Sequence, residues 1–171
     1  DHISPKEHPS MEDYFASKVK LFTMCKYGFI NSDDLYANKL PALVPNCSFK
    51  TYGIDNPSEL LAKDITVTNS SVDFKVKLDG KNQRVKTGIP GRFSVYNSLA
   101  AISVATKFGC STENIQEALL NVRVPGRSEL VDNKKELTIM IDYAHSPESL
   151  ENILTTVREY TQGKVIFVFG C

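Results

Sequence analysis

The sequence predicts a mixed α/β protein, and three patterns support this class. Near the C-terminus, the apolar run Leu137–Ile141, a helical pattern over Pro147–Tyr160 and the apolar run Val165–Phe169 follow one another. Between Asp64 and Ile89 the apolar period changes to two residues, which indicates antiparallel strands. Near the N-terminus a helix, a strand and a polar turn occur in the order that is typical of α/β domains.

The first helix is expected after Ser10, because Ser10 and Asp13 have the spacing of an N-terminal capping box. Apolar residues then recur at helical spacing as far as Phe22, and Lys18 falls within this apolar stripe. The run YGFI, residues 27–30, predicts a strand that ends in the polar turn NSDD, and SFKTYGI, residues 48–54, is compatible with another strand.

A small antiparallel meander and two helices are expected next. Asp79-Gly80 has the composition of a hairpin turn between alternating apolar residues. The following helix ends at Gly109, and Ser111 or Thr112 begins the second one. The residues that mark the two apolar helix faces are Val95, Leu99, Ile102 and Ala105, followed by Ile115, Ala118, Leu119 and Val122.

Proline and glycine in VPGRSEL, residues 124–130, mark a linker between two domains. We assign residues 1–124 to the first domain and residues 125–171 to the second. In the second domain the two apolar runs have the composition of parallel strands that are covered on both faces, with a helix between them.

The composition disfavours several classes of function. Twenty basic residues balance twenty acidic ones among 171 residues, so no overall field attracts nucleic acid or an anionic membrane. The four cysteines form no C-x-x-C pair, so we expect reduced, mostly buried thiols and no zinc site. Without a membrane-length apolar run or a leader, a cytoplasmic protein is expected. Because the chain starts at Asp1 and stops just after an apolar run, we expect a piece truncated at both ends.

Lys18 is the first residue whose position suggests chemistry, and two interpretations stand. Its stem could follow apolar surface and place the ammonium in water. Alternatively, burial favours the neutral amine, which could react with carbon dioxide to give a carbamate, an oxygen ligand for Mg²⁺. His2 and His8 precede this helix and could orient a phosphate or bind a metal, although a lone histidine is more often structural.

Asp142 and His145 lie where a predicted strand ends, which is where open α/β sheets bind ligands. Ser146-Pro147 suits a helix start whose free N–H groups could receive a phosphate. The alternative is that the loop itself satisfies both side chains. The absence of a G-x-S-x-G elbow disfavours a Ser-His-Asp hydrolase. The sequence also has no G-x-x-x-x-G-K-[ST] loop, so a protein that uses ATP would carry that loop elsewhere.

Seven segments in order resemble the Mur ligases, closest to the UDP-N-acetylmuramoyl-tripeptide synthetase (MurE) type. They are DHI, MEDYFASKVKLF, INSDD, GRFSVYNSLAAI, VPGRSELV, IDYAHSPESLENIL and VIFVFGC. By this resemblance, residues 1–124 are the second half of the central ATPase domain, with a small antiparallel hairpin region. Residues 125–171 are the first βαβ unit of the Rossmann-like C-terminal domain. A monomer is implied for the full-length protein, and no ligase activity is expected of these residues alone.

The resemblance also implies the cofactors and a metal site. Lys18 matches the family's carbamylated lysine, which helps to hold Mg²⁺, and His2 matches its metal-binding histidine. The implied reaction uses ATP to phosphorylate the terminal carboxylate of UDP-N-acetylmuramoyl-dipeptide. The amine of a free third amino acid then displaces phosphate.

Four further residues match positions that face the nucleotide in this family. Asn97 and Arg127 are ordinary in isolation, but they match residues that contact the adenine and ribose of ATP. Asp142 and His145 match a motif that faces the nucleotide and its phosphates across the domain cleft.

Departures from the family pattern leave the branch open. ISPKEHPS, residues 3–10, differs from the form expected of MurE members. DNPS, residues 55–58, resembles the motif that selects the third amino acid, but it lies in the wrong domain, and we interpret it as a loop coincidence. The alternatives are a related ATP-dependent ligase, of the folylpolyglutamate or cyanophycin synthetase type, and a non-catalytic module that retains the fold.

Overall fold

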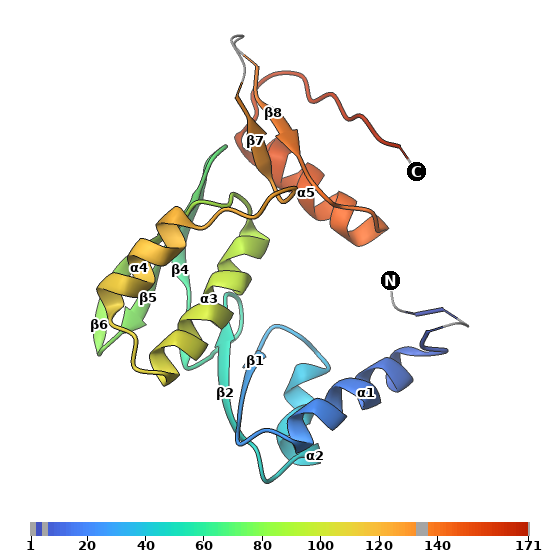
Figure 1. Ribbon diagram of the computed structural model, residues 1–171, viewed down its shortest axis with the longest axis vertical. Helices are drawn as coiled ribbons and strands as arrows, with labels where there is room; N and C mark the ends of the chain where they lie inside the picture. Colours follow the sequence, from blue (N-terminus) through green and yellow to red (C-terminus); the bar gives the residue numbers. More distant parts are fainter. Residues whose placement is uncertain (1–2, 5–6, 133–136, 171) are drawn as a thin grey trace.

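The computed structural model describes residues 3–4, 7–132 and 137–170, and Figure 1 shows the order of the elements. The described helices are α1 (Met11–Thr23), the 3₁₀ turn η1 (Ala37–Lys39), α2 (Leu40–Leu43), α3 (Arg92–Lys107), α4 (Thr112–Asn121) and α5 (Pro147–Tyr160). The described strands are β1 (Tyr27–Asn31), β2 (Ser48–Gly53), β3 (Leu60–Leu61), β4 (Lys63–Val67), β5 (Val72–Leu78), β6 (Lys81–Thr87), β7 (Glu129–Val131) and β8 (Ile139–Ile141). The predicted mixed α/β class is confirmed.

A three-stranded parallel sheet forms the N-terminal part of the fold. β1 pairs in parallel with β2, and β2 pairs in parallel with β3. Both predicted strands in this region are therefore confirmed. The carboxyl ends of β1 and β2 lie at the same edge, so the loops that follow Asn31 and Gly53 meet there.

The predicted antiparallel meander consists of β4, β5 and β6. Asp79 and Gly80 form the two-residue turn between β5 and β6, with φ angles of 49° and 74°. Two consecutive positive φ angles give the turn a twist that matches the right-handed twist of the two strands it joins, and glycine adopts such angles without strain. The sequence pattern therefore located this hairpin correctly.

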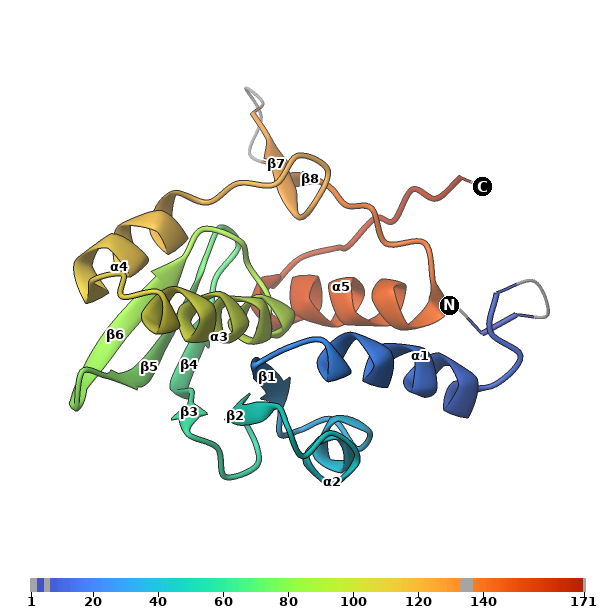
Figure 2. The same cartoon turned by 60° about the horizontal axis from the view of Figure 1, so that its bottom comes forward.

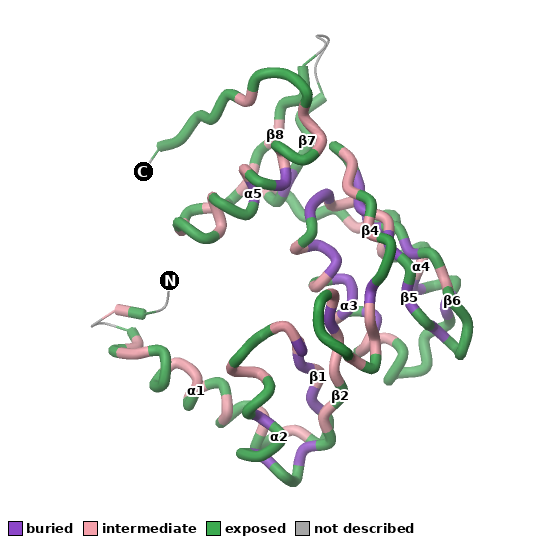
Figure 3. The backbone as a smooth tube through the Cα atoms, turned by 180° about the vertical axis from the view of Figure 1, so that it is seen from behind, coloured by how far each residue is buried: buried purple, intermediate pink, exposed green. Residues whose placement is uncertain are grey.

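The hydrophobic core lies between this hairpin and α3. Alternate residues of β5, from Val72 to Leu78, are buried against Val95, Leu99 and Ile102 of α3. In Figure 3, buried segments lie along α3 and the meander, and others lie on β1 and beside α2. Since fully burying one such side chain contributes about 1.5 to 3 kcal/mol, this core holds α3 against the meander. α3 also contacts β1 and β2, so it joins the two sheets.

α1 begins as predicted, because the Ser10 hydroxyl accepts a hydrogen bond from the Asp13 N–H at 3.2 Å. No residue of α1 is fully buried. Its last turn packs on the parallel sheet, where the ring centroids of Phe22 and Phe49 lie 5.4 Å apart. α1 is therefore anchored at its C-terminal end and exposed along most of its length.

The segment after residue 125 differs from the prediction. α5 has the predicted bounds, but β8 pairs antiparallel with β7, and residues 165–169 form no strand. Ile166 and Val168 are 83% and 91% exposed, and Ile139 and Ile141 are also exposed. Apolar composition indicated strands covered on both faces, but a strand also needs a hydrogen-bonding neighbour. No described segment supplies one to residues 165–169.

Other features of the sequence have direct structural outcomes. Of the cysteines that the structure describes, Cys47 is buried, Cys25 is partly buried and Cys110 is exposed, so the expectation of mostly buried thiols was wrong for Cys110. Within the described ranges, no helix has the length and apolar character needed to cross a membrane.

Candidate functional site

The carboxylate of Asp142, directly after β8, connects the linker to the end of this strand. One oxygen accepts a hydrogen bond from the Ser128 N–H at 2.8 Å, and the other accepts one from the Ala144 N–H at 2.8 Å. Ser128 is buried and has a φ of 46°, a left-handed conformation that few residues other than glycine adopt. Asp142 thus fixes the path of the chain on both sides of β7 and β8.

Tyr143 lies between two of the predicted nucleotide-contact residues. The guanidinium carbon of Arg127 is 4.7 Å from the Tyr143 ring centroid, and the His145 ring meets the same ring edge-on at 4.8 Å. His145 Nδ1 lies 2.9 Å from the Tyr143 carbonyl oxygen. Because a carbonyl can only accept, this nitrogen carries the proton and Nε2 is the acceptor in the neutral ring. Arg127, Asp142 and His145 therefore form one cluster.

The start of α5 uses its own side chains to satisfy its N–H groups. Ser146 caps the helix and Ser149 closes a capping box. The Ser149 hydroxyl accepts from the His145 and Ser146 N–H groups, and the Ser146 hydroxyl accepts from the Ser149 N–H. The expectation that free N–H groups at this helix start await a phosphate was wrong for these three, because the serines occupy them.

Lys18 is exposed on α1, which agrees with the interpretation that places its ammonium in water and gives no support to burial of the amine. Its Nζ lies 5.0 Å from the ring centroid of Tyr14, and Tyr14 meets the His8 ring edge-on at 5.2 Å. His8 Nδ1 is 2.6 Å from Asp13 Oδ2. His2 lies outside the described residues. Within those residues, no group of three or more His, Cys, Asp or Glu side chains is placed to hold a metal ion.

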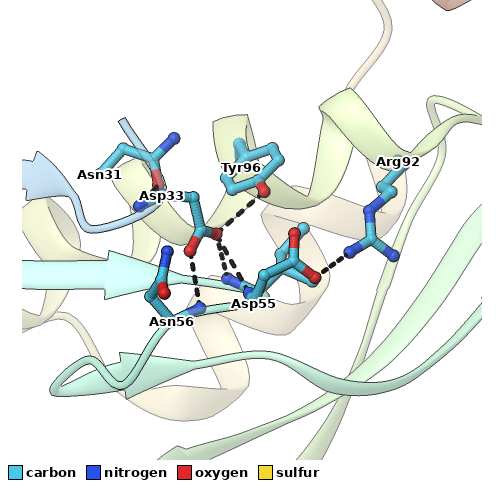
Figure 4. Close-up of polar contacts among 7 residues, drawn as sticks. Asn31, Asp33, Asp55, Asn56, Arg92 and Tyr96 are labelled. Carbon is cyan, nitrogen blue, oxygen red and sulfur yellow. Dashed lines mark hydrogen bonds and ion pairs between the residues drawn. The ribbon is translucent and has the colours of Figure 1, made fainter. Parts of the chain in front are cut away.

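Asn97 is exposed on α3, and the residue before it belongs to a polar cluster that sequence reasoning missed (Figure 4). Asp33, just after β1, accepts hydrogen bonds from the backbone N–H groups of Ile54, Asp55 and Asn56 at 2.7, 3.1 and 2.7 Å. It also accepts one from the Tyr96 hydroxyl at 2.9 Å. We call Asp33 with these four donors the Asp33 clamp.

The Asp33 clamp holds an ionised carboxylate. Burial alone would raise the pKa of Asp33, but the three backbone N–H groups, followed by the Tyr96 hydroxyl, outweigh it and lower the pKa from 3.8 to about 2. Burial and the hydrogen bond to Asp33 raise the pKa of Tyr96 to about 12. Tyr96 is therefore a neutral donor and Asp33 a charged acceptor, the stronger type of hydrogen bond.

A second contact joins the same loop to α3. Arg92, in the first turn of α3, forms an ion pair with Asp55 at 2.5 Å. Asn31 at the end of β1 accepts a hydrogen bond from the Asp33 N–H at 3.1 Å. INSDD and DNPS, residues 30–34 and 55–58, thus form one structure at the carboxyl edge of the parallel sheet. Acidic and amide residues directly after both strands were the signal in the sequence.

The predicted site residues fall in separate places. Within the described ranges, no recorded contact joins Lys18 or Asn97 to the cluster of Arg127, Asp142 and His145. Figures 1 and 2 show α1 and α5 on the same side of α3. A cavity of about 380 Å³ is lined by Ile65, Thr66, Val67, Arg92 and Glu159, which come from β4, α3 and α5. None of the predicted site residues lines it.

Comparison with known proteins gives matches over both parts of the chain. Residues 1–105 match the Mur ligase middle domain, and residues 126–171 match the Mur ligase glutamate ligase domain. The chain is 41% identical over 172 residues to a UDP-N-acetylmuramoyl-L-alanyl-D-glutamate–2,6-diaminopimelate ligase of Clostridium acetobutylicum. This match covers 100% of the chain and 35% of that protein. A ligase of the same name from Caldanaerobacter subterraneus is 42% identical over 99% of the chain and 35% of its own length.

Solved structures agree in fold. MurF from Acinetobacter baumannii superimposes with a TM-score of 0.81 at 16% identity, over 94% of this chain and 35% of that one. Folylpolyglutamate synthetase from Lactobacillus casei gives a TM-score of 0.74 at 16% identity, over 91% of this chain and 42% of that one. At such identities the likeness concerns the fold alone. The chain spans about a third of the length of the curated relatives that it matches.

Proposed function

Since this chain belongs to the Mur ligase family, we propose that it is part of an ATP-dependent ligase that adds a third amino acid to UDP-N-acetylmuramoyl-dipeptide. The amino acid is 2,6-diaminopimelate, and the product serves peptidoglycan synthesis in the cytoplasm. The observation that carries the proposal is 41% identity along the whole chain to a ligase of that name. The separate matches to a middle and a C-terminal domain support a division into residues 1–124 and 125–171.

The reaction has two steps. A carboxylate oxygen of the dipeptide attacks the γ-phosphorus of ATP, the bond to the bridging oxygen breaks, and ADP leaves with its electron pair. The amine of the third amino acid then attacks the acyl carbon, loses a proton, and inorganic phosphate leaves. The first step requires the dipeptide carboxylate in line with the γ-phosphate of ATP, and the second requires the amine beside the acyl carbon, since positioning supplies much of the rate.

The cluster at the end of β8 provides a wall for the nucleotide. Arg127 carries a fixed positive charge, and its contact with Tyr143 keeps it beside His145. Asp142 holds this wall in shape through the Ser128 and Ala144 N–H groups. We assign Arg127 and Asn97 to the ribose and adenine, and Asp142 and His145 to the side that faces the phosphates.

Lys18 is assigned as a carbamate that helps to hold Mg²⁺ together with His2 and the nucleotide phosphates. Bound Mg²⁺ would neutralise the charge that builds on the transferred phosphoryl group. Because Lys18 is exposed, carbon dioxide can reach its Nζ. None of the ion pairs found among the described residues involves Lys18, so no carboxylate blocks that nitrogen there.

The test uses the full-length protein that contains this chain, taken as a monomer. Phosphate release is measured with ATP, UDP-N-acetylmuramoyl-dipeptide and a panel of amino acids, and we expect turnover with 2,6-diaminopimelate. The 171 residues alone should release none. Lys18→Ala should lower the rate on the order of 100-fold, equal to about 2.7 kcal/mol, and added formate or acetate should restore part of it.

Lys20→Ala is the matched control, because Lys20 is also exposed on α1. Wild-type turnover in Lys18→Ala would contradict the carbamate role. Glutamate addition to a folate, without activity on the muramoyl dipeptide, would favour the folylpolyglutamate type, whose fold is similar. A full-length protein that neither binds ATP nor ligates would be a non-catalytic module.

A further inference from the structure

The Asp33 clamp joins three segments that are distant in sequence. Asp33 follows β1, residues 54–56 follow β2, and Tyr96 lies in the second turn of α3. Two of these segments lie at the carboxyl edge of the parallel sheet, and the third is the helix that carries Asn97. The clamp is therefore the polar connection between this edge and α3.

The apolar packing of α3 in the core is not directional. Val95, Leu99 and Ile102 bury the other side of the helix in the core, but hydrophobic contact has no preferred direction. A hydrogen bond weakens steeply away from its preferred distance and angle. The bond from Tyr96 to Asp33 therefore adds a directional restraint on the rotation and sliding of α3 to the restraint that packing provides.

The ion pair between Arg92 and Asp55 acts on the same face of α3. Arg92 and Tyr96 are four residues apart, so their side chains lie one above the other on the helix. Asp33 holds the backbone of Asp55, whose side chain holds Arg92. The Asp33 carboxylate thus organises both contacts with α3, and Asn97 directly follows Tyr96 in the sequence.

We propose that Asp33 is a positioning residue: through the Tyr96 hydroxyl it fixes α3 so that Asn97 meets the nucleotide in the correct orientation. The inference rests on the proposed function, which assigns Asn97 to ATP. It gives INSDD and DNPS a shared role at the nucleotide site, distinct from selection of the amino acid. Asp33 does not touch the reacting atoms.

Tyr96→Phe in the full-length ligase is the most selective test, because it removes one oxygen atom and leaves the backbone donors on Asp33. We expect the KM for ATP to rise about fivefold to tenfold, where tenfold equals about 1.4 kcal/mol. The kcat and the KM for the UDP-linked dipeptide should stay within about twofold, as expected when binding rather than chemistry is affected. Calorimetry with a non-hydrolysable ATP analogue should show the same loss of affinity.

Tyr160→Phe is the matched control, because the Tyr160 hydroxyl is buried without a hydrogen-bond partner among the described residues. It should leave the KM for ATP unchanged. Asp33→Asn should raise the KM for ATP at least as much as Tyr96→Phe, and the double variant should add little to Asp33→Asn, since coupled residues are not additive.

The results separate this inference from the proposed function. An unchanged KM for ATP in Tyr96→Phe overturns the inference, as does a loss of active protein or of Tm without a change in that KM. Absence of ligation by the wild-type enzyme contradicts the proposed function instead. Normal wild-type ligation with a nucleotide-specific loss in Tyr96→Phe supports both.

Discussion

Replacing Asp33 by asparagine should destabilise the protein in a pH-dependent way. The substitution keeps the shape of the side chain but removes the charge that three backbone N–H groups and Tyr96 share. A pKa that falls from 3.8 to about 2 stabilises the folded state by about 2 kcal/mol at neutral pH. Without solvent screening the same shift would correspond to about 2.4 kcal/mol, and the partial exposure of the carboxylate lowers that figure.

The sign of the pH effect follows from the direction of the shift. Because the folded pKa is lower than the unfolded value, the stabilisation is complete above about pH 4 and is lost as the pH falls toward about 2. Asp33→Asn has no such contribution at any pH. The difference in stability between the two proteins should therefore be largest at neutral pH and shrink below pH 4.

Thermal unfolding followed by far-UV circular dichroism is a suitable assay, because the chain contains no tryptophan. About 2 kcal/mol corresponds to a fall in Tm of about 4 to 8 °C at pH 7. Asp55→Asn is the control, since Asp55 is 63% exposed and its ion pair with Arg92 is a surface one. A difference of less than 1 °C at pH 7 for Asp33→Asn, or one that stays constant down to pH 3, would refute the reasoning.

Three further substitutions test other parts of the structure. Leu99→Ala opens a cavity at a fully buried position and should destabilise the protein by about 3 kcal/mol, which lowers the Tm by about 9 °C. Val104→Ala is the control at an exposed position of the same helix and should change the Tm little. Equal effects of the two substitutions would argue against the described core. Gly80→Ala places a side chain at a φ of 74° and should cost about 1 kcal/mol, seen as a lower Tm than for Gly163→Ala. Asp142→Ala removes the acceptor of the Ser128 and Ala144 N–H groups and should lower kcat about tenfold, equal to about 1.4 kcal/mol; unchanged kcat would remove Asp142 from the site.

Features that depend on nearby residues could be predicted from the sequence. Asp79-Gly80 located the hairpin, and Ser146-Pro147 located the start of α5, because both signals act over two or three residues. The strand expected at residues 165–169 was wrong for a physical reason. Its apolar residues have strand composition, but the neighbour that would pair with them does not lie among the described residues.

The Asp33 clamp could not be predicted, because its partners lie 21 to 23 and 63 residues along the chain. The polar turn NSDD indicated a loop, and only the parallel pairing of β1 with β2 brings residues 54–56 to Asp33. Likewise, the helical period placed Lys18 in an apolar stripe but left open whether its amine is buried. The period gives the face of a helix, but the presence of a partner for that face is a tertiary property.

Tyr143 has a consequence for any mutational survey of this protein. Its ring contacts both Arg127 and His145, although these residues are 18 positions apart in the printed sequence. A substitution at Tyr143 would therefore remove the contacts of both residues at once. Its effect on activity would resemble that of losing Arg127 or His145, although both side chains would still be present. Enzymologists who find such a phenotype at this aromatic position should examine the arginine before assigning the tyrosine a chemical task.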